Sequence, residues 1–315
     1  MTGHATLIVS PLASRIRDER ARARVIELAT GAARTRGMTG IRLVETAEPD
    51  VIRVAAAAAV ADGHDLVILA GGDGTIRDAS GALAGSGIAV GILPCGTGNL
   101  YATTVGLPHD LSAAAGVITH GTARARDAAR VTMLSPDAPP DQPPPTPIPF
   151  VVACGTGFDA RMIAATDRDL KRRYGVAAYF LAAASLLGHL EAVPTVLEVD
   201  GTRHELESVV VLVVNTAEVI PGLLRPRLPA RPDDGLLHVF VLPKGGLIDP
   251  IRGSLEIMAA QSAGLYPSGV AGRLLGRHVR VEVTPPGPTQ VDGDPYPPAW
   301  LEAAILPGAL RVLTA

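Results

Sequence analysis

An apolar run that ends in a glycine-rich turn constrains the fold of this chain more than any other feature. Residues 66–70 are Leu-Val-Ile-Leu-Ala, and residues 71–75 are Gly-Gly-Asp-Gly-Thr. A continuous apolar run of this length is typical of a buried strand in a parallel sheet. The glycines predict a tight turn at the carboxyl end of that strand, where open α/β sheets bind their ligands. We expect a helix over residues 75–84.

The composition of this turn favours phosphate binding. The backbone N–H groups around Gly71, Gly72 and Gly74, next to the start of a helix, are suited to phosphate oxygens. Asp73 would repel a bare phosphate, so we interpret it as a residue that meets a magnesium ion or handles a proton. The alternative is a plain strand-to-helix turn with Asp73 as its N-cap. Three glycines around one aspartate favour the first interpretation.

A second loop supports the first. Residues 89–93 form another short apolar run, which leads into Pro-Cys-Gly-Thr-Gly-Asn at 94–99. The Gly-Thr-Gly-Asn part offers backbone donors, a hydroxyl and an amide to a nucleotide. The chain contains no Gly-x4-Gly-Lys-Ser/Thr motif, which argues against a P-loop NTPase. The nearest approach to Gly-x-Gly-x-x-Gly is Gly-Thr-Gly-Phe-Asp-Ala at 155–160, a partial match that we interpret as a decoy.

Together, the loops at 71–75 and 94–102 resemble those of the diacylglycerol kinase catalytic domain family. Gly-Gly-Asp-Gly-Thr is shared with NAD kinases, whereas the second loop indicates the lipid-kinase branch. That branch includes bacterial soluble lipid kinases, sphingosine kinases and ceramide kinases. Further segments resemble the family's motifs in the family's order: 155–160, Lys-Arg-Arg-Tyr-Gly at 171–175, Asp-Asp-Gly-Leu-Leu at 233–237 and Val-Asp-Gly-Asp at 291–294.

The resemblance implies an ATP- and Mg2+-dependent kinase that transfers the γ-phosphate to a lipid hydroxyl, with diacylglycerol as the first candidate acceptor. The implied nucleotide-binding residues are Thr46, Gly71, Gly72, Asp73, Gly74, Thr75, Ile76, Arg77, Asp78, Gly96, Thr97 and Asn99. Asp73 is also implied in catalysis. For Thr46, a threonine at a strand end that caps the next helix is an equally good interpretation. For Arg77 and Asp78, the competing interpretation is a solvated helix end.

Two aspartates near the end of the chain carry the implied acid–base chemistry. Asp292 and Asp294 are separated by one glycine, so in an extended segment both carboxylates point to the same face. One would accept the proton of the acceptor hydroxyl while the other orients it. By resemblance the base is Asp294, which stands where the family usually has glutamate, as does Asp78. From spacing alone, an Asp-Gly-Asp hairpin turn followed by Pro295 is favoured; the family match favours the catalytic pair.

A structural magnesium site is implied near residue 234. Asp234 resembles an acidic ligand in bacterial members, with the backbone carbonyls of Arg231 and Leu236 sharing the ion. Oxygen ligands of this kind suit magnesium. The alternative is an Asp-Asp-Gly turn before a strand. Elsewhere the chain departs from the family, since Ser10 stands where asparagine precedes a proline, and Leu100 stands where many relatives carry aspartate.

The distribution of expected elements divides the chain. Strands and helices alternate from residue 5 to about 134, which predicts βαβ units and a parallel sheet. The proline-rich residues 135–149 are expected to form an exposed linker or loop. The fold class is therefore an α/β nucleotide-binding domain with a parallel sheet over 1–134. For residues 150–315 the resemblance implies a β-sandwich-like acceptor domain, with a cleft between the two.

The second half is expected to be rich in antiparallel strands joined by turns. The expected strands are 150–154, 195–199, 209–214, 236–242, 279–283 and 303–306, and the expected helices are 161–168, 176–190 and 248–263. Apolar side chains over 176–190 could line a groove for acyl chains, although such a stripe is more often ordinary core. Lys171-Arg172-Arg173 and the arginines at 225, 227 and 231 are candidate contacts for anionic headgroups, with a solvated face as the alternative.

Composition sets further limits. A net charge of −3 over 315 residues argues against a nucleic-acid binder. No signal peptide is evident, and the longest apolar stretch, 176–187, is too short to span a bilayer. We expect a cytoplasmic protein, peripheral at the inner membrane face, whose partner is a lipid alcohol; a homodimer is compatible with the resemblance. The rival hypotheses are an NAD kinase and a non-catalytic nucleotide- or lipid-binding module.

Overall fold

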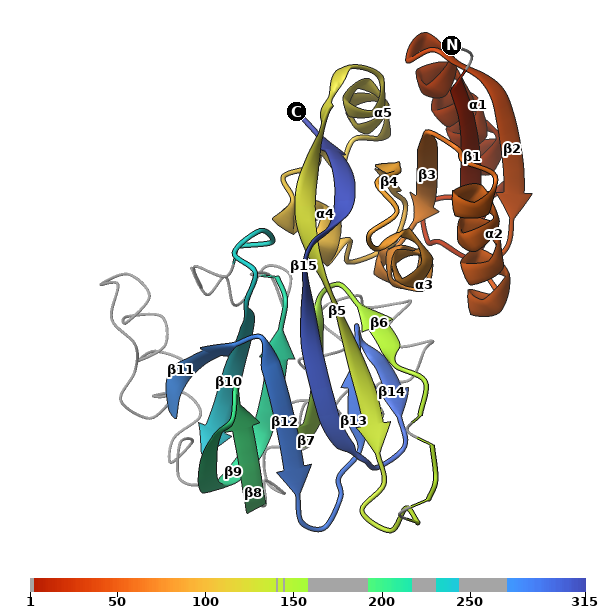
Figure 1. Ribbon diagram of the computed structural model, residues 1–315. Helices are drawn as coiled ribbons and strands as arrows, with labels where there is room; N and C mark the ends of the chain where they lie inside the picture. The colour runs from red at the N-terminus through yellow and green to blue at the C-terminus, as the bar shows by residue number, and fades with distance from the viewer. Residues whose placement is uncertain (1–2, 140, 144, 158–191, 217–230, 244–270) are drawn as a thin grey trace.

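The computed structural model describes residues 3–139, 141–143, 145–157, 192–216, 231–243 and 271–315. The chain forms two lobes that are joined by one continuous hydrogen-bonded sheet (Figure 1). Helices cover the N-terminal lobe, and strands make up the described part of the C-terminal lobe. The predicted combination of an α/β half and a β-rich half is confirmed.

The N-terminal lobe is built on four parallel strands in the order β2-β1-β3-β4. Their bounds are Gly3–Val9 for β1, Met38–Glu45 for β2, Leu66–Gly71 for β3 and Ala89–Pro94 for β4. The strand predicted from the apolar run, β3, is buried at every residue because helices cover both of its faces. The predicted parallel sheet is therefore confirmed.

Five helices form the two outer layers of this lobe. They are α1 (Glu19–Thr35), α2 (Pro49–Ala61), α3 (Asp73–Leu83), α4 (Leu100–Thr104) and α5 (Leu111–His120). The buried side chains of α1 and α5 pack on one face of the sheet, and those of α2, α3 and α4 pack on the other. The helix expected from residue 75 begins two residues earlier, at Asp73, because Gly72 rather than Asp73 is its N-cap.

The C-terminal lobe pairs its strands antiparallel, as predicted. The strands are β6 (Ile148–Phe150), β7 (Ala153–Gly157), β8 (Val193–Val199), β9 (Thr202–Val214), β10 (Leu237–Pro243), β11 (Ala271–Gly276), β12 (His278–Val283), β13 (Thr289–Val291) and β14 (Asp294–Tyr296). The prediction of a single strand over 150–154 is wrong, because residues 151–152 interrupt the strand pairing between β6 and β7. We call this interruption the β6–β7 break. The N–H groups at that break bind a side chain of the candidate site.

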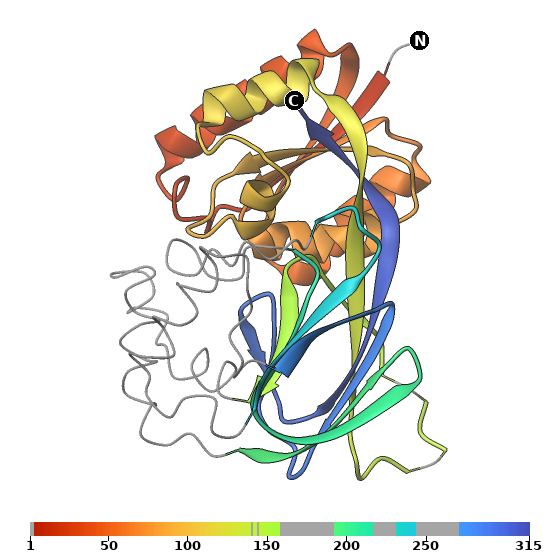
Figure 2. The same ribbon diagram turned by 90° about the vertical axis from the view of Figure 1, so that its left-hand side faces the viewer.

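Two long strands run through both lobes. β5 (Thr122–Leu134), which the sequence did not predict, pairs antiparallel with β15 (Trp300–Thr314) from one end to the other. β15 also pairs parallel with β4 through Arg311 and Val312, so the last strand of the chain completes the N-terminal sheet. Figure 2 shows β5 and β15 side by side along this path. The two lobes are therefore held together by main-chain hydrogen bonds.

Several expectations fall on segments outside the described residues. These are the helices at 161–168, 176–190 and 248–263, the apolar stripe for acyl chains, the basic run at 171–173 and the arginines at 225 and 227. Within the described residues, no helix is both long and apolar enough to cross a membrane. Cys95 and Cys154 are both buried and unbridged.

Candidate active site

Two loops at the carboxyl edge of the parallel sheet touch through their backbones. One joins β3 to α3, and the other joins β4 to α4. A Cβ on Gly96 would lie 2.6 Å from the Cα of Gly72, and a Cβ on Gly71 would overlap the Oγ1 of Thr75. Relaxed carbon contacts are about 3.5–4.0 Å, so neither position has room for a side chain. The structure therefore brings together the two loops that the sequence assigned to one nucleotide.

Asp73 links these loops through hydrogen bonds. Its carboxylate accepts from the backbone N–H groups of Leu100 (Oδ2, 3.0 Å) and Tyr101 (Oδ1, 2.9 Å). These are the first two residues of α4, and the N-cap of that helix, Asn99, makes no side-chain capping bond. A carboxylate is favourable at a helix N-terminus because it satisfies donors that have no partner within the helix. Asp73 thus caps α4 from α3, which neither sequence interpretation anticipated.

Asn99 shapes the second loop from within. Its backbone is left-handed, with φ of 50°, and the residue is 3% exposed. Its Oδ1 accepts from Gly96 N at 2.9 Å, and its Nδ2 donates to Gly96 O at 2.8 Å. The amide that the sequence offered to a nucleotide is therefore used to hold the loop. Thr97, at the tip of the same loop, is exposed.

The structure places the other residues that were predicted to contact the nucleotide in different surroundings. Ile76 is 3% exposed and packs in the core between the sheet and α2, so its side chain faces away from the loops. Thr75 is also buried. The Oγ1 of Thr46 accepts from the N–H of Glu48 at 3.1 Å, and Glu48 is the N-cap of α2. That bond supports the capping interpretation of Thr46.

Arg77 connects α3 to the C-terminal lobe. Its Nε donates to Asp78 Oδ1 at 2.9 Å, and its Nη1 donates to Asp294 Oδ2 at 2.6 Å. Burial lowers the pKa of Arg77, but the two carboxylates more than offset it, so the net shift is upward and the side chain stays charged. The structure thus brings three predicted site residues, from two distant parts of the sequence, into one ion-paired cluster. The alternative interpretation of Arg77 as part of a solvated helix end is therefore wrong.

Asp292 and Gly293 form a tight turn between β13 and β14. Their φ angles are 48° and 81°, the left-handed values that a two-residue hairpin loop requires, and Val291 pairs with Asp294 across it. The expectation of an extended segment is therefore wrong, and the hairpin alternative is confirmed. The two carboxylates have different hydrogen-bond partners.

The carboxylate of Asp292 is occupied by backbone donors. It accepts from Val151 N at 2.9 Å, Val152 N at 2.8 Å and Ala153 N at 2.9 Å, the N–H groups at the break between β6 and β7. Burial raises the pKa of Asp292 to about 7, although these three hydrogen bonds act to lower it. Asp292 therefore anchors the turn that carries Asp294, and its predicted catalytic role stays a prediction.

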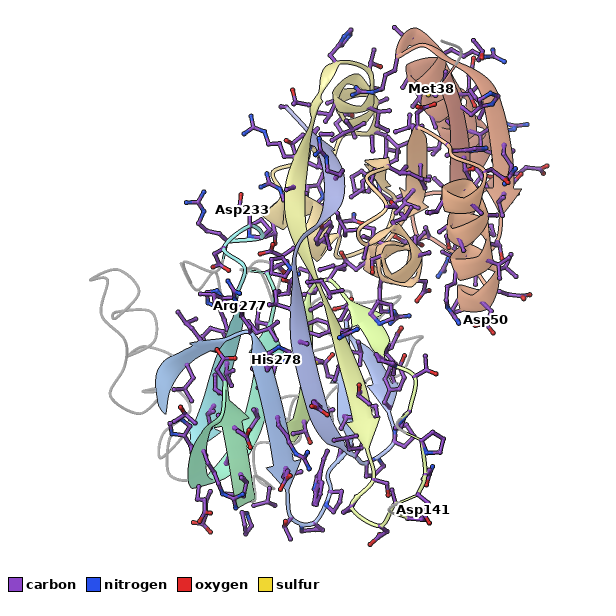
Figure 3. The ribbon with its side chains drawn as sticks, in the orientation of Figure 1. Met38, Asp50, Asp141, Asp233, Arg277 and His278 are labelled. Atoms are coloured by element: carbon purple, nitrogen blue, oxygen red, sulfur yellow. The ribbon has the colours of Figure 1, made fainter. Side chains whose placement is uncertain are left out.

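Asp234 lies in the loop before β10, next to Asp233, which Figure 3 labels. Its carboxylate accepts from the N–H groups of Arg231 (3.2 Å) and Leu236 (3.1 Å), and it lies 2.9 Å from Nε2 of the buried His238. The predicted magnesium site required carbonyl oxygens of Arg231 and Leu236, yet these residues present N–H groups to Asp234. In the part of the chain that the structure describes, no group of three or more His, Cys, Asp or Glu could hold a metal. These hydrogen bonds match the turn alternative, and the magnesium site stays a prediction.

Two supporting residues have no signal in the sequence. Arg15 donates from Nη1 to the carbonyls of Pro94 (3.1 Å) and His109 (2.6 Å), so it steadies the second loop from the segment after β1. Asp127 of β5 is 2% exposed and accepts from Gly235 N and Gly308 N, both at 2.7 Å. Each stands among other charged residues and in no motif, and only the tertiary structure shows its partners.

Comparison with known families agrees with this geometry. Residues 4–131 match the model of the diacylglycerol kinase catalytic domain, and residues 152–314 match that of the YegS C-terminal NAD kinase beta sandwich-like domain. The chain belongs to the diacylglycerol kinase catalytic-domain family of lipid kinases. As a member, it is a phosphotransferase with an alcohol acceptor.

Individual relatives cover most of the chain. A Mycobacterium tuberculosis protein named diacylglycerol kinase is 28% identical over 99% of this chain and 95% of its own length. A Pseudomonas aeruginosa protein named probable lipid kinase YegS-like is 30% identical over 81% of this chain and 78% of its own. The Synechocystis protein sll0036 is 27% identical over 80% of this chain, which spans only 55% of that protein. A crystal structure titled as a diacylglycerol kinase from Bacillus anthracis has a TM-score of 0.70 at 22% identity, covering 99% and 97% of the two chains, and so shares the fold.

Proposed function

We propose that this chain transfers the γ-phosphate of MgATP to the free hydroxyl of diacylglycerol at a membrane surface. The observation that carries the proposal is the 2.6 Å ion pair between Arg77 and Asp294. Arg77 lies in the helix that begins with the Gly-Gly-Asp-Gly-Thr turn, and Asp294 is the candidate base. The ion pair therefore supports a site in which the phosphate-binding turn and the proton acceptor meet.

In this proposal the first turn of α3 binds the phosphates of ATP. The leading N–H groups of a helix have no partner within the helix, so they are available to phosphate oxygens. Asp294, with a side chain that is 56% exposed, accepts the proton of the acceptor hydroxyl. The hydroxyl oxygen forms the new bond to the γ-phosphorus as the bond to the β-phosphate oxygen breaks, and ADP leaves. Magnesium arrives with ATP as part of the substrate and offsets phosphate charge.

The two halves of the chain have separate tasks in this scheme. Residues 1–134 supply the nucleotide platform, and residues 150–315 supply the base and the acceptor side, although β15 returns to the first lobe. The family's description and the name of the Mycobacterium tuberculosis relative support diacylglycerol as the acceptor. Because that lipid resides in membranes, the enzyme would work from the cytoplasmic membrane surface, where ATP is available.

The proposal is tested by transfer from γ-labelled ATP to dioleoylglycerol in mixed micelles, with magnesium or with EDTA. We expect a magnesium-dependent product that runs with phosphatidic acid. NAD is offered as a separate acceptor, and labelled NADP would refute the proposal in favour of an NAD kinase. Asp294→Asn should lower kcat about 10²- to 10⁴-fold, the contribution typical of a general base, while ATP binding is retained. Asp141→Asn, at an exposed loop position, is the matched control.

A further inference from the structure

Arg77 is a nearly buried cation shared by three acceptors. Its side chain is 7% exposed, and a charge removed from water to that degree is stable only when it is paired. Nε contacts Asp78, while Nη1 contacts both Asp294 Oδ2 and, at 3.4 Å, the carbonyl of Val291. Two of these acceptors belong to the β13–β14 hairpin. Arg77 is thus a cross-link from the helix of the phosphate-binding turn to the hairpin of the base.

Asp78 sets the direction of this cross-link. Its side chain is 12% exposed, and burial raises its pKa, whereas the adjacent guanidinium lowers it. A guanidinium is a rigid planar fork, so a carboxylate that binds its Nε edge also fixes where the Nη atoms point. Asp78 therefore holds the Arg77 plane with Nη1 aimed at β14. A lysine could not be held in this way, since its ammonium is a single point of charge.

Asp294 is restrained on one side and open on the other. The backbone before it is anchored because Asp292 binds three consecutive N–H groups, and its Oδ2 is bound by Arg77. Among the described residues, no protein donor contacts Oδ1. One carboxylate oxygen is therefore fixed, and the other is presented to whatever lies beside the hairpin.

We propose that Arg77 is a positioning residue that acts through Asp294. By holding Oδ2, it orients Oδ1 toward the acceptor hydroxyl. This inference rests on the proposed function, in which Asp294 is the base, and it departs from the interpretation of Arg77 as a phosphate contact. It also accounts for an aspartate where the family usually has glutamate, because the long arginine side chain reaches out from α3 to the shorter acid.

A double-mutant cycle on kcat tests the proposal. Arg77→Gln alone should lower kcat about 10²-fold, the effect of misplacing a catalytic group by roughly 1 Å, with the ATP Kd changed by less than about threefold. In the Asp294→Asn background, Arg77→Gln should have no further effect, because the group it positions is already gone. Asp78→Asn should lower kcat in the same direction, and Arg77→Lys should not restore it. Arg42→Gln, which removes an exposed ion pair with Asp62, is the matched control.

Three outcomes would overturn the inference. Equal effects of Arg77→Gln in both backgrounds, or a parallel loss of ATP affinity, would assign Arg77 to the phosphates. An unchanged kcat in Arg77→Gln would show that Arg77 does not position the base. Thermal unfolding of the wild type, Arg77→Gln, Asp294→Asn and the double variant measures the ion pair without an acceptor. If the midpoint shifts of the two single variants add up to that of the double variant, the pair does not exist in solution. If the wild-type chain phosphorylates no lipid while the unfolding shifts are non-additive, the proposed function fails and the ion pair stands.

Discussion

The close approach of Gly96 to Gly72 makes Gly96→Ala a sharp perturbation of the nucleotide platform. The new Cβ would lie 2.6 Å from the Cα of Gly72 and 2.9 Å from the Oδ1 of Asn99. Relief to a relaxed contact of about 3.5–4.0 Å moves the two loops apart by roughly 1 Å. Both neighbours resist this movement, since one is backbone and the other is an amide hydrogen-bonded on both sides.

The cost of such overpacking is about 1–3 kcal/mol. If ATP binds only when the loops are together, its binding must overcome that strain, and its affinity falls about 5- to 150-fold. Isothermal titration of ATP measures this loss directly, and thermal unfolding without ATP measures how much strain the free protein already carries. Strain that the free protein relieves by moving the loops apart appears as lost affinity, whereas strain that it retains appears as a lower unfolding midpoint.

A matched glycine separates this clash from a general effect of alanine. Gly31 lies within α1, has open space within 4 Å of the point where a Cβ would stand, and does not need a left-handed backbone. Gly31→Ala should therefore stabilise the chain by about 0.5–1 kcal/mol and leave ATP binding alone. If Gly96→Ala binds ATP as tightly as the wild type, the argument that the two loops form one nucleotide site through this contact is refuted.

Two further predictions concern charge. Because burial raises the pKa of Asp292 from 3.8 to about 7, the folded chain holds a proton that the unfolded chain has released between those values. The contribution of Asp292 to the unfolding free energy should then fall by about 4 kcal/mol as pH rises through that window, and Asp292→Asn should flatten the pH dependence of thermal unfolding; parallel curves would contradict this. For Asp234, dialysis against EDTA should leave the unfolding midpoint unchanged because N–H groups and His238 already occupy the carboxylate. A midpoint that falls and is restored by Mg2+ would overturn that view.

The parts of the fold set by local sequence could be predicted, and the long-range pairings could not. β3 and its turn are local, because an apolar run and three glycines determine them. β5 escapes prediction since residues 122–134 are rich in alanine and arginine, which have no strong preference for strands. Its stability comes from pairing with β15, far along the chain, and no local pattern records that partner.

The hairpin at Asp292 is predictable from its own residues. An Asp-Gly pair between strand-like residues is among the strongest hairpin signals, and spacing alone favours the turn. The family resemblance favours the catalytic pair instead, and only the extended backbone that would set both carboxylates on one face is contradicted by the structure. The structure shows that the turn and a role for Asp294 are compatible, because the turn buries Asp292 against the β6–β7 break and leaves Asp294 at the start of β14.

The contacts in the structure change how two departures from the family pattern, Leu100 and Asp294, are interpreted. Leu100 stands where many relatives carry aspartate, yet it is the backbone N–H of Leu100 that Asp73 binds, and every residue except proline supplies that donor. The substitution therefore leaves the link between the two loops intact. The shorter Asp294 is likewise met by the guanidinium of Arg77. At both positions the structure supplies a hydrogen bond that a letter-by-letter comparison of motifs does not record, so neither departure by itself argues for an inactive kinase.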